Sequence, residues 1–442
     1  MELVQVTSQE IIKPSSPTPP HLKYFKISIF DQLYPVYYEP LLFFYRSNPN
    51  LSIEEKLGRL KESLSKTLTR FYPLAGKIKD STTIHCNDEG VLFAVARVGY
   101  AMIDCLKPLN IELLNKFIVL HPTCKESPEK SVQLGIQVNI FTCGGIAIGI
   151  SFLHKFIDGT TFMAFVKGWA AITRENFNQE WCRHSVGASL FPPNHGQFSA
   201  QMPFFAEITP RPEQKKIAKW FVIDAAAITS LKMKSRSENV YNPTRAEAIS
   251  GLIWKCLISS DSPEPTTLVH LINLRPKLSP PLPENSVGVI MWRAIATYDP
   301  RKERKKELPR LVDLLRKSIA EVSAEYLSKL QGQEGKEKMF KVLEEGREIY
   351  ARSRRTYVVS SISKMGFYEA DFGWGNPLWA TVSPIIQEVQ INMIYQIQTE
   401  SGNGIEVMAI LEDRDMEKLE RHPEFRAYAR LKPDFQALQA CI

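Results

Sequence analysis

The amino-acid sequence predicts a mixed α/β fold made of two lobes of similar size. Patterns typical of strands and of helices are interleaved along the whole chain of 442 residues, and each half contains one hairpin pattern. Between the halves, residues 176–216 have little periodicity and contain several prolines. A long stretch without a pattern inside a compact protein is usually a linker or a functional loop. We therefore assign residues 1–175 to a first lobe, 176–216 to a crossover loop and 217–442 to a second lobe.

The chain begins with a segment that is rich in proline. Residues 13–20 contain four prolines, which exclude regular structure, so we expect an extended arm that lies on the body of the protein. A strand pattern follows at residues 25–29 and leads directly into Asp31 and Gln32. A further strand with a turn is predicted at residues 83–90.

Between these strands lies the pattern of a long amphipathic helix. Ser52 and Glu55 have the spacing of a capping box, and apolar residues follow at helical intervals over 57–71. Residues 72–76 contain a proline and a glycine, which end the helix. The apolar stripe is expected to pack in the core of the first lobe.

A hairpin pattern stands near the end of the first lobe. Apolar residues alternate with polar ones over 132–140, which indicates a half-buried strand, and the alternation returns over 146–152. His154 has the parity of the apolar face of the second strand, so we expect it where the packed side of the sheet opens. Asp158 suits the N-cap of a helix that includes residues 162–169.

The second lobe repeats this mixture of elements. Thr244 and Glu247 have the spacing of a capping box and stand ahead of apolar residues at helical intervals. The remaining predicted elements are strands at 219–223 and 269–274, a charged helical region at 308–355, and a hairpin formed by 389–395 and 405–411.

The composition is that of an ordinary soluble protein, with 44% apolar and 23% charged residues. No run of about 18 apolar residues is present, so we expect no membrane span, and the N-terminus lacks the pattern of a secretory signal. The net charge of +7 could attract an anionic ligand such as a phosphorylated cofactor, although solvated lysines are the favoured explanation. Basic residues are not interleaved with aromatic ones, so no nucleic-acid partner is expected.

The seven cysteines are scattered along the chain and form no Cys-x-x-Cys motif. This pattern predicts free thiols in a reducing compartment, with neither a disulfide framework nor a zinc site. We therefore expect a cytoplasmic protein, and no stretch indicates an oligomer interface, so a monomer is expected. The cysteines are Cys86, Cys105, Cys124, Cys143, Cys182, Cys256 and Cys441.

One stretch is a candidate for catalysis. His154 ends a strand pattern, and Asp158 and Gly159 precede a helix pattern. A histidine at a strand end is held by its backbone while its ring can face a cleft. This suits a general base, which must stay at a fixed distance from a reacting hydroxyl group. A single His-x-x-x-Asp motif occurs often by chance, so its meaning depends on the rest of the chain.

A second motif, Asp-Phe-Gly-Trp-Gly at residues 371–375, lies in the C-terminal half. Together with residues 154–159 it closely resembles the signature pair of the plant BAHD acyltransferases, which use acyl-CoA. The resemblance extends over nearly the whole chain and is strongest to the branch of vinorine synthase and deacetylvindoline acetyltransferase. Further segments that carry the resemblance are residues 12–19, 31–32, 71–77, 86–88, 242–245 and 273–275.

The resemblance implies a two-lobed fold of the chloramphenicol acetyltransferase type, with a tunnel at the lobe interface. Acyl-CoA would enter from one side and an alcohol from the other, with His154 midway between them. The imidazole would accept the hydroxyl proton as the oxygen attacks the thioester, and CoA would leave from a tetrahedral intermediate. Because the thioester is already activated, no metal, permanently bound cofactor or acyl-enzyme is implied.

The favoured interpretation is transfer of an acetyl group from acetyl-CoA to a hydroxyl group of an alkaloid or terpenoid. The expected partners are thus two small molecules, with no nucleic acid and no membrane. Two alternatives stay open. The enzyme could use a longer acyl-CoA or a sugar-ester acceptor, or the chain could be a non-catalytic relative with a binding role.

The resemblance also assigns roles to the two motifs. Asp158 is implied to turn away from the tunnel and to form a structural ion pair, for which Arg275 is the candidate. The alternative, in which Asp158 contacts His154 as in a Ser-His-Asp triad, stays open. Gly159 permits close approach of the backbone. The second motif is expected to form a structural turn away from His154, through Asp371, Gly373, Trp374 and Gly375.

An oxyanion donor is implied a little upstream of the second motif, and Ser360 is the candidate. Three positions depart from the common family pattern. Ile362 stands where relatives have Trp, Val289 where many have Asn, and Asn376 where Lys or Arg is common. These departures affect the acceptor pocket and the coenzyme contacts.

Ser250 and Lys255 are candidates for contacts with the CoA phosphates, because they are expected to open and flank a helix that approaches the coenzyme in relatives. The alternative is that both are ordinary residues of a helix surface. His85 and His195 are assigned no catalytic role, since the first belongs to a strand pattern and the second to the crossover loop.

Overall fold

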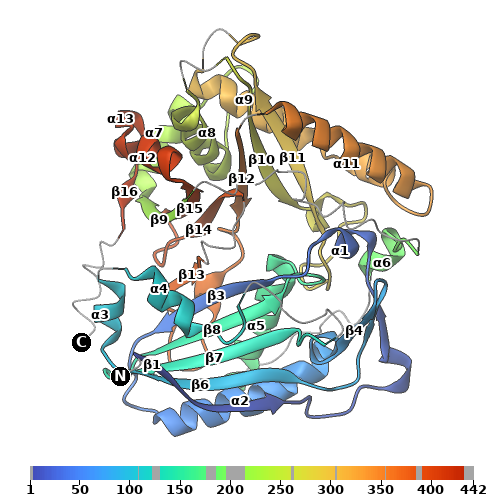
Figure 1. Ribbon diagram of the computed structural model, residues 1–442, viewed down its shortest axis with the longest axis vertical. Helices are drawn as coiled ribbons and strands as arrows, with labels where there is room; N and C mark the ends of the chain where they lie inside the picture. Colours follow the sequence, from blue (N-terminus) through green and yellow to red (C-terminus); the bar gives the residue numbers. More distant parts are fainter. Residues whose placement is uncertain are drawn as a thin grey trace.

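The structure is a computed structural model of the chain. It describes residues 3–107, 109–121, 130–175, 186–195, 215–259, 263–303, 306–353, 355–384 and 391–432. Two large sheets with both parallel and antiparallel strands, each accompanied by helices, form two lobes that stand one above the other in Figure 1. This arrangement confirms the predicted mixed α/β fold with two lobes.

The first lobe is built on a six-stranded sheet with the order β1-β6-β7-β8-β3-β13. Within it, β6 and β7 run parallel and the other neighbours are antiparallel. β7 and β8 form the predicted hairpin. The strands are β1 (Val4–Ile12), β3 (Tyr38–Tyr45), β6 (Val91–Val98), β7 (Leu134–Phe141), β8 (Ile146–Leu153) and β13 (Trp379–Val382).

β7 is buried on both faces, so the prediction of a half-buried strand is wrong. Gln137 and Asn139 lie on the face that the alternation assigned to water. A short helix, η3 (Asn115–Phe117), covers this face, and the two side-chain amides donate to carbonyls of Lys116 at 2.8 Å and Phe117 at 3.0 Å. The alternation therefore reflects polar contacts inside the protein, since buried polar groups are normally hydrogen-bonded.

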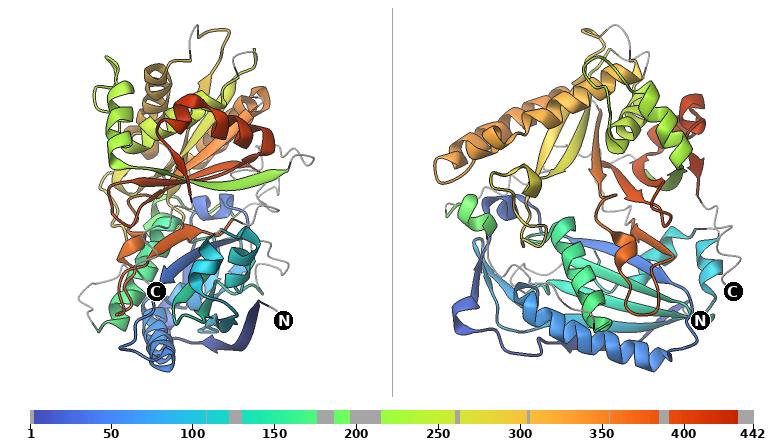
Figure 2. Two further views of the ribbon diagram at one scale, coloured as in Figure 1. Left: turned by 90° about the vertical axis from the view of Figure 1, so that its left-hand side faces the viewer. Right: turned by 180° about the vertical axis from the view of Figure 1, so that it is seen from behind.

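Two long helices, α2 and α5, lie side by side across the first sheet (Figure 2, right). Both predicted N-caps are present, because Ser52 forms the capping box of α2 and Asp158 caps α5. Nε1 of Trp169 on α5 donates to the carbonyl of Leu60 on α2 at 3.1 Å, which joins the helices. Their bounds are Ile53–Arg70 for α2 and Gly159–Thr173 for α5.

The second lobe is built on a seven-stranded sheet with the order β11-β10-β12-β14-β15-β9-β16. β12 runs parallel to both β10 and β14, and β14 and β15 form the predicted second hairpin. The strands are β9 (Lys216–Ile223), β10 (Thr266–Asn273), β11 (Met291–Tyr298), β12 (Arg355–Ser361), β14 (Asn392–Gln398), β15 (Ile405–Glu412) and β16 (Arg430–Leu431).

Helices cover the second sheet, and α8 begins with the predicted capping box of Thr244 and Glu247. The charged region at 308–355 is divided into three helices, and Arg355 already belongs to β12. In the described part of the chain, no helix is both long and apolar enough to cross a membrane. The helices are α7 (Ala225–Lys234), α8 (Arg245–Leu257), α9 (Leu308–Glu321), α10 (Ala324–Ser328), α11 (Gly335–Arg352), α12 (Asp413–Arg421) and α13 (Pro423–Arg426).

The strand predicted at 25–29 ends early, and a short helix follows it. Ser28 and Asp31 form a capping box, which starts the helix at Ile29. A small sheet of order β2-β5-β4 includes the strand predicted near residue 83. The remaining elements are η1 (Pro20–Leu22), β2 (Tyr24–Lys26), α1 (Ile29–Leu33), η2 (Tyr72–Ala75), β4 (Lys77–Asp80), β5 (Thr83–His85), α3 (Met102–Leu106), α4 (Ile111–Leu114), α6 (Val186–Leu190), η4 (Arg275–Lys277) and η5 (Phe367–Glu369).

The proline-rich arm lies on α2, as predicted. The backbone N–H of Ser15 donates to the carbonyl of Ser65 at 3.0 Å, and the Ser65 hydroxyl donates to the carbonyl of Lys13 at 2.7 Å. The residues before the arm form β1, an edge strand that the sequence analysis did not predict.

One strand of the first sheet comes from the C-terminal half of the chain. β13 lies in the range 217–442 that was assigned to the second lobe, yet it pairs with β3 of the first sheet. Trp379 of β13 is fully buried and stacks on Phe44 with ring centroids 5.3 Å apart. Of the predicted crossover loop, residues 176–185 and 196–214 lie outside the described residues.

Candidate active site

His154 follows β8 and is held by the neighbouring end of β3. Its backbone N–H donates to the carbonyl of Tyr37 at 2.9 Å. The imidazole stacks on the rings of Tyr34 and Tyr37, with centroids 4.8 Å and 5.3 Å away. Lys155 fixes this contact, because its ammonium group donates to the carbonyls of Gln32 and Tyr34. The ring of His154 is therefore oriented by aromatic stacking.

Burial changes the proton affinity of His154. The side chain is 8% exposed, and burial lowers the pKa of the imidazole from 6.5 to about 4. The backbone of His154 itself and the charge of Asp158 act in the opposite direction but do not restore the ordinary pKa. The ring is thus neutral at neutral pH and can accept a proton.

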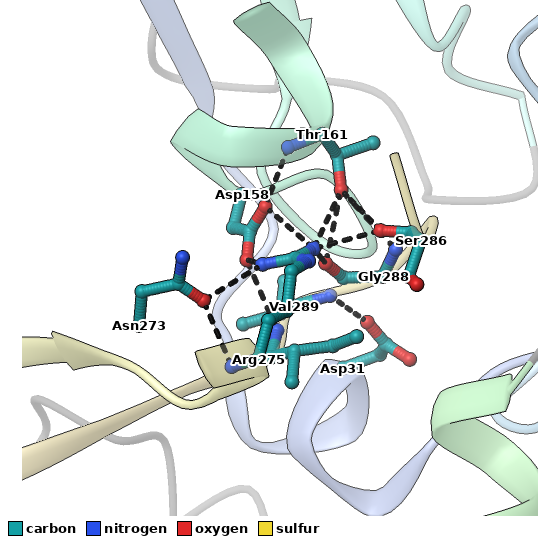
Figure 3. Close-up of polar contacts among 9 residues, drawn as sticks. Asp31, Asp158, Thr161, Asn273, Arg275, Ser286, Gly288 and Val289 are labelled. Carbon is teal, nitrogen blue, oxygen red and sulfur yellow. Dashed lines mark hydrogen bonds and ion pairs between the residues drawn. The ribbon is translucent and has the colours of Figure 1, made fainter. Parts of the chain in front are cut away.

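Asp158 forms the predicted ion pair with Arg275 (Figure 3). The two side chains are fully buried, and the guanidinium donates to both carboxylate oxygens, at 2.7 Å and 3.1 Å. Asp158 also accepts the backbone N–H groups of Thr161 and Ile290. Burial alone would raise the pKa of Asp158, but the charge of Arg275 and these hydrogen bonds lower it below its ordinary value. Asp158 therefore stays ionised at neutral pH.

The same ion pair fastens a segment of the second lobe to the first. Arg275 donates to the carbonyls of Ser286 at 2.8 Å and Gly288 at 3.0 Å. The backbone N–H of Val289 donates to Asp31 of α1 at 2.7 Å (Figure 3). Val289 is fully buried. Val289, which departs from the family pattern, is therefore enclosed by protein, and its backbone N–H is bound by Asp31.

Asp158 and His154 form no hydrogen bond with each other in this structure. All of the polar contacts of Asp158 go to the cap of α5, to Arg275 and to Ile290. The buried Nδ1 of His154 has no hydrogen-bond partner among the described residues. The geometry therefore favours the ion pair over a triad for Asp158. Next to it, Gly159 is approached by the side chain of Met365, whose Cε would lie 3.0 Å from an added Cβ.

The Asp371–Gly375 motif forms a tight turn. Asp371 accepts the backbone N–H groups of Gly373 at 2.8 Å and Gly375 at 2.9 Å, and both glycines have φ above 100°. Phe372 is fully buried and packs edge-on against Trp169 with centroids 4.7 Å apart. Trp169 is ten residues beyond Gly159, or about 15 Å along α5. The motif thus packs against the far part of α5 from His154.

Ser360 lies on β12, directly beside Tyr395 of β14. Residues paired in this way point to the same face of the sheet. The phenol of Tyr395 donates to Glu39 of β3 at 3.0 Å, which joins the two lobes. Glu39 pairs with Phe152, and Phe152 and His154 lie on the same side of β8. A continuous set of contacts therefore leads from Ser360 to the surroundings of His154.

The sequence analysis did not identify four residues of this site. They are Tyr34, Tyr37, Glu39 and Tyr395. The aromatic residues resemble ordinary core residues, and their proximity depends on strand register and on contact between the lobes. The sequence does contain a signal for Glu39. It is the one charged residue of β3 and stands among apolar neighbours.

The proposed coenzyme residues have different surroundings from those expected. Ser250 lies inside α8, not at its start, and is fully buried with its hydroxyl accepting a hydrogen bond from Gln396 at 2.8 Å. Lys255 lies near the end of α8 and pairs with Glu424 at 2.7 Å. A phosphate contact by Lys255 stays a prediction and would require the ammonium group to leave this carboxylate.

The other predicted positions are located as follows. Ile362 is buried at 8% exposure, and Asn376 is exposed. His85 stacks on Tyr24 in the small sheet, and His195 is exposed. Within the described ranges, no three His, Cys, Asp or Glu side chains are grouped so that they could hold a metal ion. A surface hollow at one end of α2 contains none of the predicted site residues. It is lined by Ser15, Lys66, Thr69, Arg70, Ile172 and Glu175.

Comparison with known proteins supports the family resemblance along almost the whole chain. The family model described as "Transferase family" matches residues 2–426. Akuammiline synthase 2 from Alstonia scholaris is 34% identical over 445 residues, which is 97% of each chain. A limonoid 7-O-acetyltransferase from Citrus sinensis is also 34% identical, over 97% of this chain and 98% of its own.

Solved structures share the architecture. Vinorine synthase superposes with a TM-score of 0.79 at 28% identity and covers 96% of this chain and 98% of its own. F. sporotrichioides TRI101, in a complex with coenzyme A and T-2, superposes with a TM-score of 0.72 at 17% identity, over 92% of this chain and 99% of its own. The second likeness concerns the fold alone.

The two-lobed fold and these relatives define an acyltransferase that uses an acyl-CoA co-substrate. The chain belongs to the plant BAHD family of acyl-CoA-dependent O-acyltransferases.

The buried ion pair gives a prediction for stability. Replacing Asp158→Asn keeps a capping side chain but leaves the charge of Arg275 buried without a partner, which costs about 3–5 kcal/mol. Chemical denaturation followed by tryptophan fluorescence should show a loss of this size.

Asp224→Asn is the matched control. Asp224 caps α7 with the same 2.8 Å hydrogen bond, but its side chain is 49% exposed. Asparagine caps a helix about as well as aspartate, so a change within about 0.5 kcal/mol is expected. Equal losses in the two variants would contradict the role given to the buried charge.

Proposed function

We propose that this enzyme transfers an acetyl group from acetyl-CoA to a hydroxyl group of an alkaloid or terpenoid, with His154 as the general base. One observation carries the proposal. The ring of His154 is held at a strand end between two tyrosines and is neutral at neutral pH. The similarity over nearly the full length to a limonoid 7-O-acetyltransferase supports the acetyl donor and this class of acceptor.

The reaction follows from the position of the ring. Nδ1 of His154 is buried, so we assign the proton transfer to Nε2. Nε2 accepts the proton of the hydroxyl group while the oxygen attacks the thioester carbon, which gives a tetrahedral intermediate and an imidazolium. The intermediate then expels the thiolate of CoA, and the proton passes to sulfur. A positioned base of this kind contributes about 10²–10⁴ in rate.

We also propose that a tunnel between the lobes reaches His154. Its support comes from residues that are enclosed and yet partly accessible. Burial raises the pKa values of Tyr37, Glu39 and Tyr395, but each side chain keeps part of its surface accessible to solvent. Residues with both properties are expected beside an internal space. Tyr37 stacks on the ring of His154, Glu39 is diagonal to His154 on the same face of the sheet, and Tyr395 binds Glu39.

Ser360 is our proposed oxyanion donor. Its side chain is half-buried, and its hydroxyl has no hydrogen-bond partner in the described part of the chain. It points to the same side of the second sheet as Tyr395, and Tyr395 contacts the first lobe beside His154. A free hydroxyl at this place could donate to the oxygen of the tetrahedral intermediate.

We further propose that the enzyme acts as a cytoplasmic monomer. The cysteines of the described residues support a reducing compartment, because Cys86, Cys105, Cys143 and Cys256 are all free thiols.

Replacing His154→Ala should lower kcat by about 10²–10⁴, because the general base is lost, when the variant is assayed at a temperature at which it is folded. Steady-state kinetics with acetyl-CoA and a panel of plant alcohols, read by mass shift, measures this. His85→Ala is the control and should keep full activity, since His85 lies in the small sheet. Unchanged turnover of the His154 variant would exclude it as the base.

The acid limb of kcat/KM should lie well below pH 6.5. Burial lowers the pKa of His154 to about 4, so the base loses its function only when the pH falls toward that value. Initial rates between pH 4.5 and 8, with recovery of activity checked at pH 7.5, test this. The check is needed because a histidine with a lowered pKa destabilises the folded state as the pH falls from about 6.5 to 4.

Glu39 requires a control in the same experiment. Its pKa is raised to about 7, so its ionisation could add a step to the profile. The profile of Glu39→Gln should lack such a step and should keep the low acid limb. An acid limb near pH 6.5 in this variant would show that His154 is not in the environment described.

Ser360→Ala should lower kcat by about 10²-fold with little change in the KM for acetyl-CoA, because an oxyanion donor acts mainly in the transition state. Ser361→Ala is the matched control. Successive side chains of a strand point to opposite faces, so Ser361 faces away from Tyr395 and its loss should leave kcat unchanged. Equal effects in both variants would count against the assignment.

A further inference from the structure

Glu39 has a half-buried carboxyl group that the proposed reaction does not use. It lies on β3, opposite Phe152 of β8, and the carbonyl of Tyr37 on the same chain segment binds the backbone of His154. Glu39 is therefore diagonal to His154 on the same face of the sheet. Diagonal neighbours of this kind are about 7–8 Å apart, which is within the length of a small acceptor molecule.

Most buried carboxylates among the described residues have a cationic partner. Four of the five buried acidic side chains form an ion pair with an Arg or Lys, and the fifth, Asp31, accepts hydrogen bonds from Ser28 and Val289. Glu39 is half-buried and forms no ion pair within the described residues. Within the described residues, its side chain accepts a hydrogen bond from the phenol of Tyr395 on one carboxylate oxygen, at 3.0 Å. The four ion pairs are Asp158–Arg275, Glu247–Arg316, Asp415–Arg355 and Glu406–Lys432.

Three tyrosines lie near the unpaired carboxyl group. Tyr395 donates to Glu39, and the charge of Glu39 acts on Tyr34 and Tyr37, which stack on His154. Burial raises the pKa of all three tyrosines, so their rings stay neutral. A carboxylate together with several aromatic faces is the chemistry that binds ammonium groups, through charge and cation–π attraction.

Glu39 and Tyr395 also remain partly accessible to solvent, as a binding site for a small molecule requires. A neutral acceptor could only exchange hydrogen bonds with this carboxyl group. A cation would in addition supply the missing counter-charge in an enclosed place, where electrostatic attraction is stronger than in water. The surroundings of Glu39 therefore favour a cationic ligand.

We propose that Glu39, with the rings of Tyr34, Tyr37 and Tyr395, forms an ammonium-binding subsite, and that the acceptor alcohol carries a protonated or quaternary nitrogen. The inference rests on the proposed function, because the site is recognised by its position beside His154. Within the acceptor classes named above, it selects basic alkaloid alcohols over neutral terpenoids.

Two matched alcohols test the proposal. Choline and 3,3-dimethylbutan-1-ol have the same shape and differ in a quaternary nitrogen in place of a carbon. Titration calorimetry with the full-length protein and no acyl-CoA measures binding without turnover. We expect choline to bind at least about tenfold more tightly than the neutral alcohol. Glu39→Gln should reduce this ratio to about one and leave the binding of the neutral alcohol unchanged.

Tyr395→Phe is the control variant. It keeps the aromatic ring and removes the hydroxyl that binds Glu39. Because this hydrogen bond lowers the pKa of Glu39, the preference for choline should remain but should appear at a higher pH. For the wild type the preference should grow as the pH rises from 6 to 8, because the carboxyl group ionises in this range while His154 and the three tyrosines stay neutral. Lys155, whose pKa burial lowers to about 8, also loses its charge near the upper end of this range, so the increase between pH 6 and 7 is the part that reports on Glu39.

The proposal would be overturned by equal binding of the two alcohols, by no binding of either, or by a preference for choline that survives in Glu39→Gln. Turnover of the same alcohols with acetyl-CoA separates it from the proposed function. Acetylation of both alcohols without a binding preference removes the subsite and keeps the acyltransferase reaction. A Glu39-dependent preference without acetylation of any alcohol keeps the subsite and counts against the reaction.

Discussion

The ion pair between Asp158 and Arg275 is the interaction on which the arrangement of the two lobes depends. Its partners are 117 residues apart and come from different lobes, and both are fully buried. Asp158 also caps α5, and Arg275 holds the carbonyls of Ser286 and Gly288. A buried pair adds little net stability, but a single buried charge is costly, so the pair restricts how the lobes can meet. The strand end that presents His154 is fixed as a consequence.

The surroundings of His154 favour orientation over basicity. Stacking on Tyr34 and Tyr37 and the removal of water keep the ring neutral, yet they also make it a weaker base than a histidine in water. Most of the rate enhancement must then come from holding the alcohol and the thioester in line with the ring and from stabilising the oxyanion. The selection of the acceptor alcohol therefore depends on the residues near the ring, among them Glu39.

The sequence predicted those features that one segment determines by itself. The capping boxes at Ser52 and Thr244, both hairpins and the helix after Asp158 were found because their signals are local. The pairing of Asp158 with Arg275 came from the family resemblance. The burial of β7 and the meeting of Glu39 with Tyr395 could not be predicted, because the first depends on a covering helix and the second on contact between lobes.

The position of β13 has a consequence for how the chain is made. The first sheet is completed by residues 379–382, although its other strands all lie before residue 154. During synthesis at about 5–20 residues per second, the edge of β3 must wait for more than ten seconds until its last neighbour leaves the ribosome. An exposed edge strand is a site of wrong pairing, so nascent chains should need a chaperone or a temporary partner at β3 during this interval. For the same reason, the N-terminal half expressed by itself should tend to aggregate.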